Sequence, residues 1–179
     1  MDGQVLILYH CNKQEECLKF LNKQDYLISS QEDGIWLGKG MYFWDNISNA
    51  RFWKREKIKR ESNSQLSIVC IKANGDRILD LTDLEVCNKI ADIWIKLSEK
   101  GKIKFENEPL GKKLNVLYEI FPDFIKMYPM IKIYGMYSKT PKNNLFSYDI
   151  RTQKAEPTLI SKCIYSIKDS KCILEKEQY

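Results

Sequence analysis

The sequence contains a single histidine, His10, and few of the residues that form linkers, metal sites or disulfide frameworks. Eight Gly and five Pro among 179 residues, with no biased tract, argue against a linker-rich or disordered chain. One histidine excludes the zinc and iron sites that need two, and we expect no metal. The six cysteines include no C-x-x-C spacing, so we expect free, buried thiols and neither a zinc site nor a disulfide.

Long apolar runs are also missing. The longest, such as residues 5–9, have the length of a strand, and the first residues lack the basic and apolar segments of a signal peptide. We therefore expect a cytoplasmic protein without a membrane partner. A length of 179 residues with 44% hydrophobic and 30% charged residues predicts one domain over residues 1–179.

The first third of the chain predicts two strands, each followed by a helix. A buried strand at 5–9 is expected to end in a polar turn at 10–12, and Asn12 is expected to cap a helix at 13–23. Residues 34–46 are predicted to form an aromatic strand interrupted by glycines. A helix at 48–61 is expected to follow, capped by Asp45, Asn46 or Ser48.

The remainder predicts strands at both ends of a helical region. A strand at 66–73 is followed by the turn signal Asn74-Gly75 and by a short strand at 77–81 that is expected to return from it. A capping-box signature at 82–85 and apolar periodicity predict one helix there and another at 110–121. Strands are expected at 130–134, 158–167 and 172–174. The chain is therefore predicted to be α+β, with a helical insertion at about 82–128.

Residues 36–53 carry the strongest motif. The run Trp-Leu-Gly-Lys-Gly-Met-Tyr-Phe-Trp-Asp at 36–45, then Ser-Asn-Ala-Arg-Phe-Trp at 48–53, resembles the NAD-binding segment of the ADP-ribosyltransferase superfamily, in its poly(ADP-ribose) polymerase-like branch. Leu-Tyr-His at 8–10 is similar to the histidine motif of that family. The resemblance implies a fold of two packed, mainly antiparallel sheets with flanking helices.

The resemblance also implies roles for individual residues. His10 would bind the 2′-hydroxyl of the nicotinamide ribose, and Tyr42 and Trp53 would enclose the nicotinamide ring between them. Cys11 would use its backbone on the carboxamide, and Asn12 would lie near the adenine-side ribose. The remaining implied cofactor-binding positions are Gly38, Gly40, Phe43, Ser48 and Ala50, the last in place of a serine found in many relatives.

The third catalytic residue of the family is normally a glutamate at the start of a late strand, where a carboxylate stabilises an oxocarbenium-like centre. Glu156 precedes the strand predicted at 158–167 and is our candidate for this role. A shifted alignment would place Ser161 or Ile164 there, and Glu156 is equally compatible with a surface position.

Six basic and two acidic residues lie between Arg51 and Glu61, which gives +4 of the chain's net charge of +5. This basic helix is either a solvated face or a rim that attracts the NAD pyrophosphate or a nucleic acid.

The sequence thus predicts an enzyme that transfers ADP-ribose from NAD to a nucleic acid or protein and acts as an intracellular toxin or defence effector, with an antitoxin as a possible partner. The alternatives are an NAD glycohydrolase and a catalytically degenerate module that binds NAD or RNA.

Overall fold

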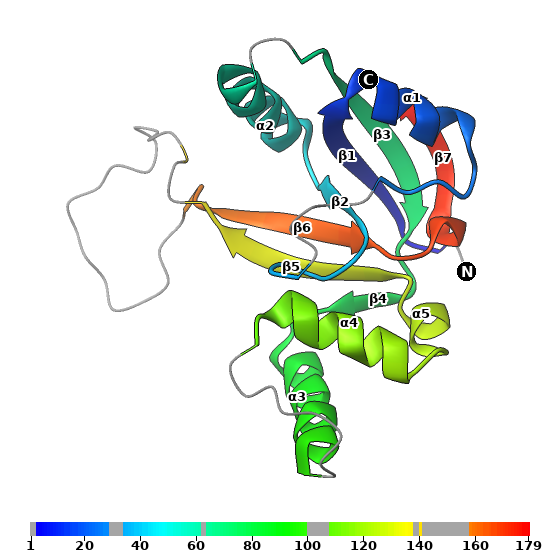
Figure 1. The fold of residues 1–179 in the computed structure, drawn as a ribbon, viewed down its shortest axis with the longest axis vertical. Coiled ribbons are helices and arrows are strands. Elements are labelled where there is room, and N and C mark those ends of the chain that lie inside the picture. Colours follow the sequence, from blue (N-terminus) through cyan, green and yellow to red (C-terminus); the bar gives the residue numbers. More distant parts are fainter. Residues whose placement is uncertain (1–2, 29–33, 62–63, 100–107, 138–139, 141–157) are drawn as a thin grey trace, which may run out of the picture.

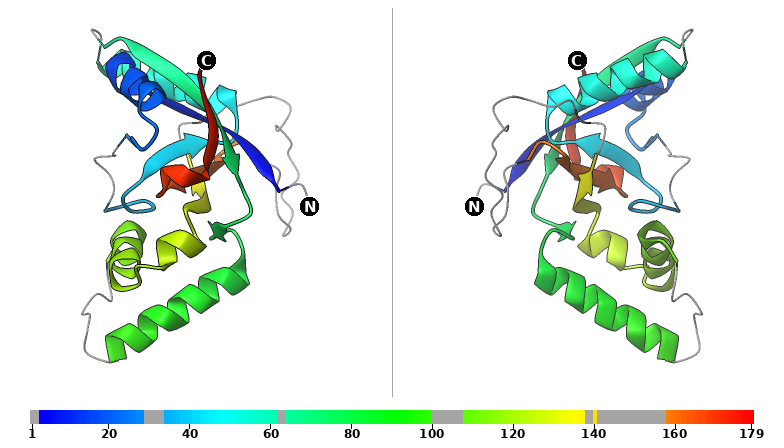
Figure 2. Two further views of the ribbon diagram at one scale, coloured as in Figure 1. Left: turned by 90° about the vertical axis from the view of Figure 1, so that its right-hand side faces the viewer. Right: turned by 90° about the vertical axis from the view of Figure 1, so that its left-hand side faces the viewer.

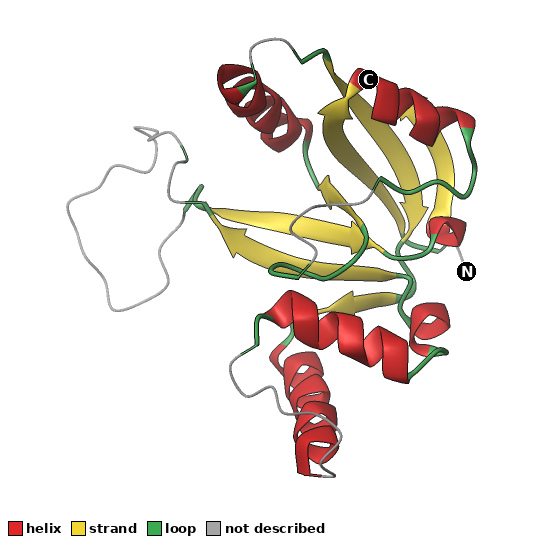
Figure 3. Cartoon of the chain, in the orientation of Figure 1, coloured by secondary structure: helices red, strands yellow, loops and turns green. Residues whose placement is uncertain are grey.

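The computed structural model describes residues 3–28, 34–61, 64–99, 108–137, 140 and 158–179. These residues form a mixed α+β structure (Figures 1 and 3). In chain order, its elements are β1 (Val5–Lys13), α1 (Gln14–Asn22), β2 (Met41–Trp44), α2 (Ile47–Arg60), β3 (Leu66–Asn74), β4 (Ile78–Asp80), α3 (Leu84–Glu99), α4 (Leu110–Ile120), α5 (Phe124–Met127), β5 (Met130–Met136), β6 (Ser161–Ile167), a 3-10 turn η2 (Ser170–Cys172) and β7 (Ile173–Gln178).

The described strands form one seven-stranded sheet in the order β4-β5-β6-β2-β1-β3-β7. The described strands are mainly antiparallel, as expected, but they form one sheet where two packed sheets were expected. Pairing within the sheet is nevertheless weak between β1 and β2, which share the single register pair Tyr9↔Trp44, whereas β1 pairs with β3 along its whole length. We call this place the joint. In Figure 1, β5 and β6 run across the direction of β1, β3 and β7, so the two halves of the sheet diverge at this joint.

Strand β1 is longer than the sequence predicts. The turn expected at residues 10–12 is absent, because pairing with β3 continues to Lys13↔Leu66. Asn12 is therefore a strand residue, and the residue that precedes α1 is Lys13, whose side chain makes no capping hydrogen bond. The ladder to β3 satisfies the backbone groups that a turn would otherwise have used, and this overrides the local polar signal.

The predicted strand at 34–46 is also wrong in extent, since Met41–Trp44 alone forms β2. Gly38 and Gly40 have φ angles of +77° and +154°, values outside the extended conformation of a strand. The loop at 34–40 is held from both sides: Lys168 Nζ donates to the carbonyl of Leu37 at 2.5 Å, and Lys39 N donates to Asn115 Oδ1 at 2.7 Å.

Helix α2 confirms its prediction, including one of its three candidate caps. Asn46 precedes the helix, and its side chain accepts a hydrogen bond from Asn49 N at 3.0 Å. The helix rests on the sheet through Ala50, which is fully buried in a cluster with Cys11 and Ile68. This contact fixes the face that α2 turns toward β1.

Strand β4 does not return along β3, as the turn signal at Asn74-Gly75 predicts. It lies at the opposite edge of the sheet and pairs in parallel with β5, in the register Ile78↔Met130. Both edges of β3 are already occupied, by β1 on one side and by β7 on the other. The hairpin therefore has no free edge to form on.

The helices predicted at 82–85 onward and at 110–121 are confirmed as α3 and α4, and Figure 2 shows them with α5 at one end of the molecule, beyond β4 and β5. Their core includes Leu79, Leu114 and Leu117, all at most 1% exposed. All six cysteines are free and five are buried, as predicted. Among the described helices, none is long and apolar enough to cross a bilayer.

Candidate active site at the joint between β1 and β2

His10 bridges the two strands where they diverge. Its Nδ1 lies 2.6 Å from the backbone carbonyl oxygen of Tyr42 on β2. Because a carbonyl only accepts, Nδ1 must carry the proton, and this leaves Nε2 of the neutral ring as an acceptor. Two sequence motifs that are 32 residues apart are thus joined by one hydrogen bond.

His10 is held in the neutral state. Burial lowers its pKa from 6.5 to about 4, and the positive charge of Lys57 adds to this effect against the opposing hydrogen bond to Tyr42. The ring also packs against Phe43, with centroids 5.5 Å apart. At neutral pH the side chain therefore offers an unprotonated Nε2.

Asn12 links His10 to the basic helix. Its Nδ2 lies 3.4 Å from His10 Nε2, and its Oδ1 accepts a hydrogen bond from Lys57 Nζ at 3.3 Å. Lys57 follows Trp53 by one helical turn, so both project from the same side of α2. The joint thus contains an imidazole, an amide and an ammonium group in one chain of contacts.

Tyr42 directs its hydroxyl to the preceding loop. This hydroxyl donates to the carbonyl of Gly38 at 2.7 Å and accepts from Leu37 N at 3.0 Å. At Gly40 a Cβ would lie 2.5 Å from Ser166 Oγ, so the chain at this point tolerates no side chain. The two glycines of the motif thus shape the loop that holds the Tyr42 ring.

Several of the remaining implied residues lie in the packed interior. Phe43 and Ala50 are fully buried, and Cys11 is 4% exposed. Burial raises the pKa of the Cys11 thiol to about 11, so the thiol is neutral at pH 7 and could contribute through its backbone alone. Ser48 is exposed on the first turn of α2.

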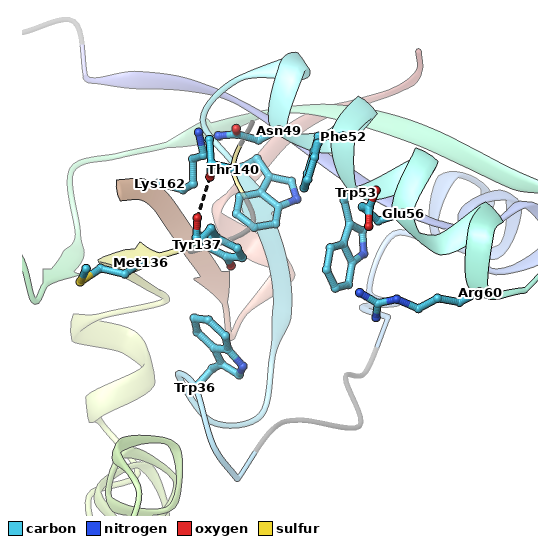
Figure 4. A pocket seen from close by; sticks show the side chains of 11 residues that line it. Trp36, Asn49, Phe52, Trp53, Glu56, Arg60, Met136, Tyr137, Thr140 and Lys162 are labelled. Carbon is cyan, nitrogen blue, oxygen red and sulfur yellow. Dashed lines mark hydrogen bonds between the residues drawn. The ribbon is translucent and has the colours of Figure 1, made fainter. Parts of the chain in front are cut away.

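A cavity of about 270 Å³ opens beside Trp53 (Figure 4). Its walls are largely aromatic, and their rings pack on one another: Tyr137 stacks on Trp36 with centroids 5.9 Å apart and meets Trp44 edge-on at 5.4 Å. The aromatic residues that line it are Trp36, Trp44, Phe52, Trp53 and Tyr137. They come from the loop before β2, from β2, from α2 and from the chain after β5.

Polar groups lie at the rim of this aromatic cavity. Lys162 reaches it from β6, and Glu56 and Arg60 reach it from α2. The Arg60 guanidinium lies 5.6 Å from the centre of the Trp53 ring. Asn49 also lines the cavity, and its buried Nδ2 has no hydrogen-bond partner within the described part of the chain.

The structure thus brings His10, Asn12 and Tyr42 to the joint and places Trp53 at the aromatic cavity. Neither His10 nor Tyr42 lines that cavity. Glu156 lies outside the described residues. Within those residues, no group of three or more His, Cys, Asp and Glu side chains comes together.

Sequence reasoning missed Lys57 as an individual site residue, and it missed the cavity residues Trp36, Asn49, Tyr137 and Lys162. Lys57 could have been found from its spacing of four from Trp53 on one helix. Asn49 has no such signal, because its unsatisfied amide appears only in the folded structure. Lys162 and Tyr137 lie far from α2 in sequence and reach the cavity through the pairing of β2, β6 and β5.

A comparison with models of known protein families finds no match for this chain. A relative among the curated proteins is an uncharacterized protein of Methanocaldococcus jannaschii, which is 26% identical over 151 aligned positions that cover 71% of this chain and 70% of that protein. No solved structure matches. Similarity at this level defines no family.

Proposed function

We propose that the protein is an NAD-dependent ADP-ribosyltransferase whose NAD site lies at the joint between β1 and β2. The observation that carries the proposal is the hydrogen bond from His10 Nδ1 to the carbonyl oxygen of Tyr42, 2.6 Å long. It unites the two motifs that resemble this family, and it leaves Nε2 as an acceptor, which a ribose hydroxyl would take over from the long 3.4 Å contact with Asn12 Nδ2.

The electrostatics of the joint support an anionic dinucleotide as ligand. His10 is neutral at pH 7 and adds no charge, while Lys57 brings a positive charge to the same contacts. Trp53, one turn before Lys57, offers an aromatic face for a flat ring. An ammonium group for the pyrophosphate and an indole for the nicotinamide thus come from one helix.

In the proposed reaction, the bond between C1′ of the ribose and N1 of nicotinamide breaks, and its electron pair leaves with nicotinamide. His10 Nε2 accepts a hydrogen bond from the ribose 2′-hydroxyl and orients the sugar. A nucleophile of the acceptor then forms the new bond to C1′ and loses its proton. A carboxylate near C1′ would stabilise the developing positive charge.

Two carboxylates are candidates for that role. Glu156 is the one that the family resemblance implies. Glu56 is the carboxylate that lines the aromatic cavity among the described residues, with Lys59 Nζ donating to it at 2.7 Å.

One observation favours a second function, a module that binds NAD or ADP-ribose without turnover. The described strand β6 (Ser-Lys-Cys-Ile-Tyr-Ser-Ile) has no carboxylate, and its residue at the cavity is Lys162. A cation at that position would oppose an oxocarbenium-like centre. The expected toxin or defence role remains a prediction.

The test is incubation of the purified protein with cell extract and NAD labelled in the adenylate, with nicotinamide release measured in parallel. Transferase activity predicts a labelled macromolecule and its loss in His10→Ala, while Lys171→Ala, an exposed change on η2, behaves as the wild type. Glu156→Gln and Glu56→Gln identify the carboxylate by loss of nicotinamide release. Nicotinamide release with free ADP-ribose alone indicates a glycohydrolase, and NAD binding without release indicates the degenerate module. Equal labelling by His10→Ala contradicts the proposed site.

A further inference from the structure

The aromatic cavity beside Trp53 has features that the proposed NAD site does not use. It shares Trp53 and the candidate carboxylate Glu56 with that site but contains neither His10 nor Tyr42. Its volume of about 270 Å³ is below the range of about 300–1,000 Å³ typical of pockets for drug-sized ligands. The cavity therefore has room for one flat ring system, and the rest of a larger ligand would lie outside it.

The walls of the cavity suit a heteroaromatic ring. Trp36, Trp44 and Tyr137 hold one another through stacked and edge-on contacts, and Trp53 faces them from α2 (Figure 4). Rigid aromatic faces of this kind bind bases by stacking, whatever the base is. A double-stranded nucleic acid could not supply such a ring without unpairing it, so the favoured ligand is single-stranded.

Asn49 adds a group that requires a partner. Its Nδ2 is buried at the cavity and is a donor without an acceptor in the described part of the chain. Buried donors are rarely left unpaired, because the lost hydrogen bond to water is not replaced. If the Asn49 amide turns toward the cavity, the carbonyl and ring-nitrogen acceptors on the edge of a base would supply that partner.

The charge around the cavity indicates a polyanion. Helix α2 carries six basic residues and one acidic residue, and Arg60 and Lys162 stand at the rim of the cavity. The acidic residue, Glu56, is paired with Lys59 at 2.7 Å, so its charge is compensated. A peptide matches this excess only where it is rich in acidic residues, whereas every nucleic-acid backbone presents one phosphate per nucleotide.

We propose that this cavity binds an unpaired base of a single-stranded nucleic acid while Arg60 of α2 and Lys162 of β6 contact the flanking phosphates. The role of the bound strand rests on the proposed function, because the strand would be the acceptor of ADP-ribose. The binding itself needs no NAD.

The test measures binding of fluorescently labelled oligonucleotides of mixed sequence without NAD, as RNA and as DNA, each paired with an abasic strand that has the same backbone. Binding to intact strands is expected to exceed binding to abasic strands by about 5- to 150-fold, the range for loss of one stacked base. Trp36→Ala should remove this advantage without weakening the abasic strand, while Tyr134→Ala, an exposed aromatic residue on β5, should retain it.

A second set of variants tests the phosphate contacts. Arg60→Gln and Lys162→Gln should each lower the slope of log affinity against log salt by about 0.7, and Lys171→Gln should leave the slope unchanged. A preference for RNA or for DNA identifies the sugar, and either one supports the proposal.

Equal affinity for intact and abasic strands overturns the proposal, and this comparison uses the wild-type protein, so it does not depend on a variant that folds. Absence of binding at low salt also overturns it. In both cases NAD turnover could still be present, and the proposed function would stand with a protein acceptor. Conversely, base-dependent binding without nicotinamide release would support the proposal that the cavity binds a base and would contradict the proposed transferase function.

Discussion

The neutral state of His10 gives a prediction about stability that needs no substrate. The folded protein is expected to hold this ring unprotonated until the pH approaches 4, whereas an unfolded chain protonates it near 6.5. Between these values the unfolded state binds more protons than the folded state. Stability must therefore fall as the pH decreases from about 7 toward 4, and it is fully present above about pH 7.

The size of this effect follows from the two pKa values. One proton taken up by the unfolded state alone changes the free energy of unfolding by about 1.4 kcal/mol per pH unit. Integrated from pH 7.5 to pH 5, with the folded pKa at about 4, the loss is about 2 kcal/mol. His10 keeps part of its surface in contact with water, so this is an upper value. It is still a sizeable part of a typical stability of about 5–15 kcal/mol.

The matched variant is His10→Asn. Its side-chain amide can donate to the Tyr42 carbonyl from the place of Nδ1, but it does not titrate. Urea unfolding at a series of pH values should show the wild type losing its advantage over the variant as the pH falls below 6.5, by up to about 2 kcal/mol at pH 5.

Because His10 is the sole histidine of the chain, its two ring C–H protons give the only histidine NMR signals, and its titration can be followed directly. The folded-state midpoint is expected below pH 5. A midpoint of 6.5 or higher, or parallel pH profiles for wild type and His10→Asn, would refute the assignment of a buried, neutral His10.

Three further predictions concern the surroundings of the joint. Tyr42→Phe keeps the ring but removes the hydroxyl that binds the backbone of Leu37 and Gly38, so urea unfolding should show a loss of about 1–2 kcal/mol, and NAD affinity should decrease less than in Tyr42→Ala. Gly40→Ala should lower the free energy of unfolding by about 1–3 kcal/mol, because φ is +154° and the added Cβ meets Ser166 Oγ at 2.5 Å. In the control Gly34→Ala the Cβ would meet Lys112 Cγ at 3.6 Å, and the change should stay within about 0.5 kcal/mol. Equal losses in the two variants would contradict the strain argument. Iodoacetamide at pH 7.5 should alkylate the half-buried Cys87 before Cys11, since burial raises the pKa of the Cys11 thiol to about 11. Equal alkylation rates of the two thiols, measured by mass spectrometry on the native protein, would disprove this order.

Predictions that depend on adjacent residues agreed best with the structure. The Asn46 cap of α2 could be found because the capping residue and the amide it binds are three residues apart. The helices α3 and α4 could be found because apolar periodicity is a local signal. His10 and Tyr42 were recognised as motif residues, and their contact agrees with that interpretation without testing it.

Predictions failed where pairing between segments far apart in the sequence determines the structure. The end of β1 was placed too early because its continuation depends on Leu66 and Ser67 of β3. The hairpin after Asn74 was predicted from a turn signal that says nothing about which strand edge is free. The motif at 36–53 contains four of the aromatic residues of the cavity, but the cavity itself could not be predicted, since its formation requires Trp44 to lie beside Ile164 of β6.

The weak joint between β1 and β2 also determines when the site can form during synthesis. With one register pair to β1, the four residues of β2 depend on β6, where Met41 pairs with Ile167. At about 5–20 residues per second, a ribosome needs roughly 6–25 s to add the residues between these two strands. During that interval the pair with Tyr9 is the one sheet contact open to the aromatic segment around Trp44, which stays exposed to aggregation or to chaperones. A nascent chain would therefore be inactive until β6 emerges, and the candidate site would be among the last parts of the protein to fold.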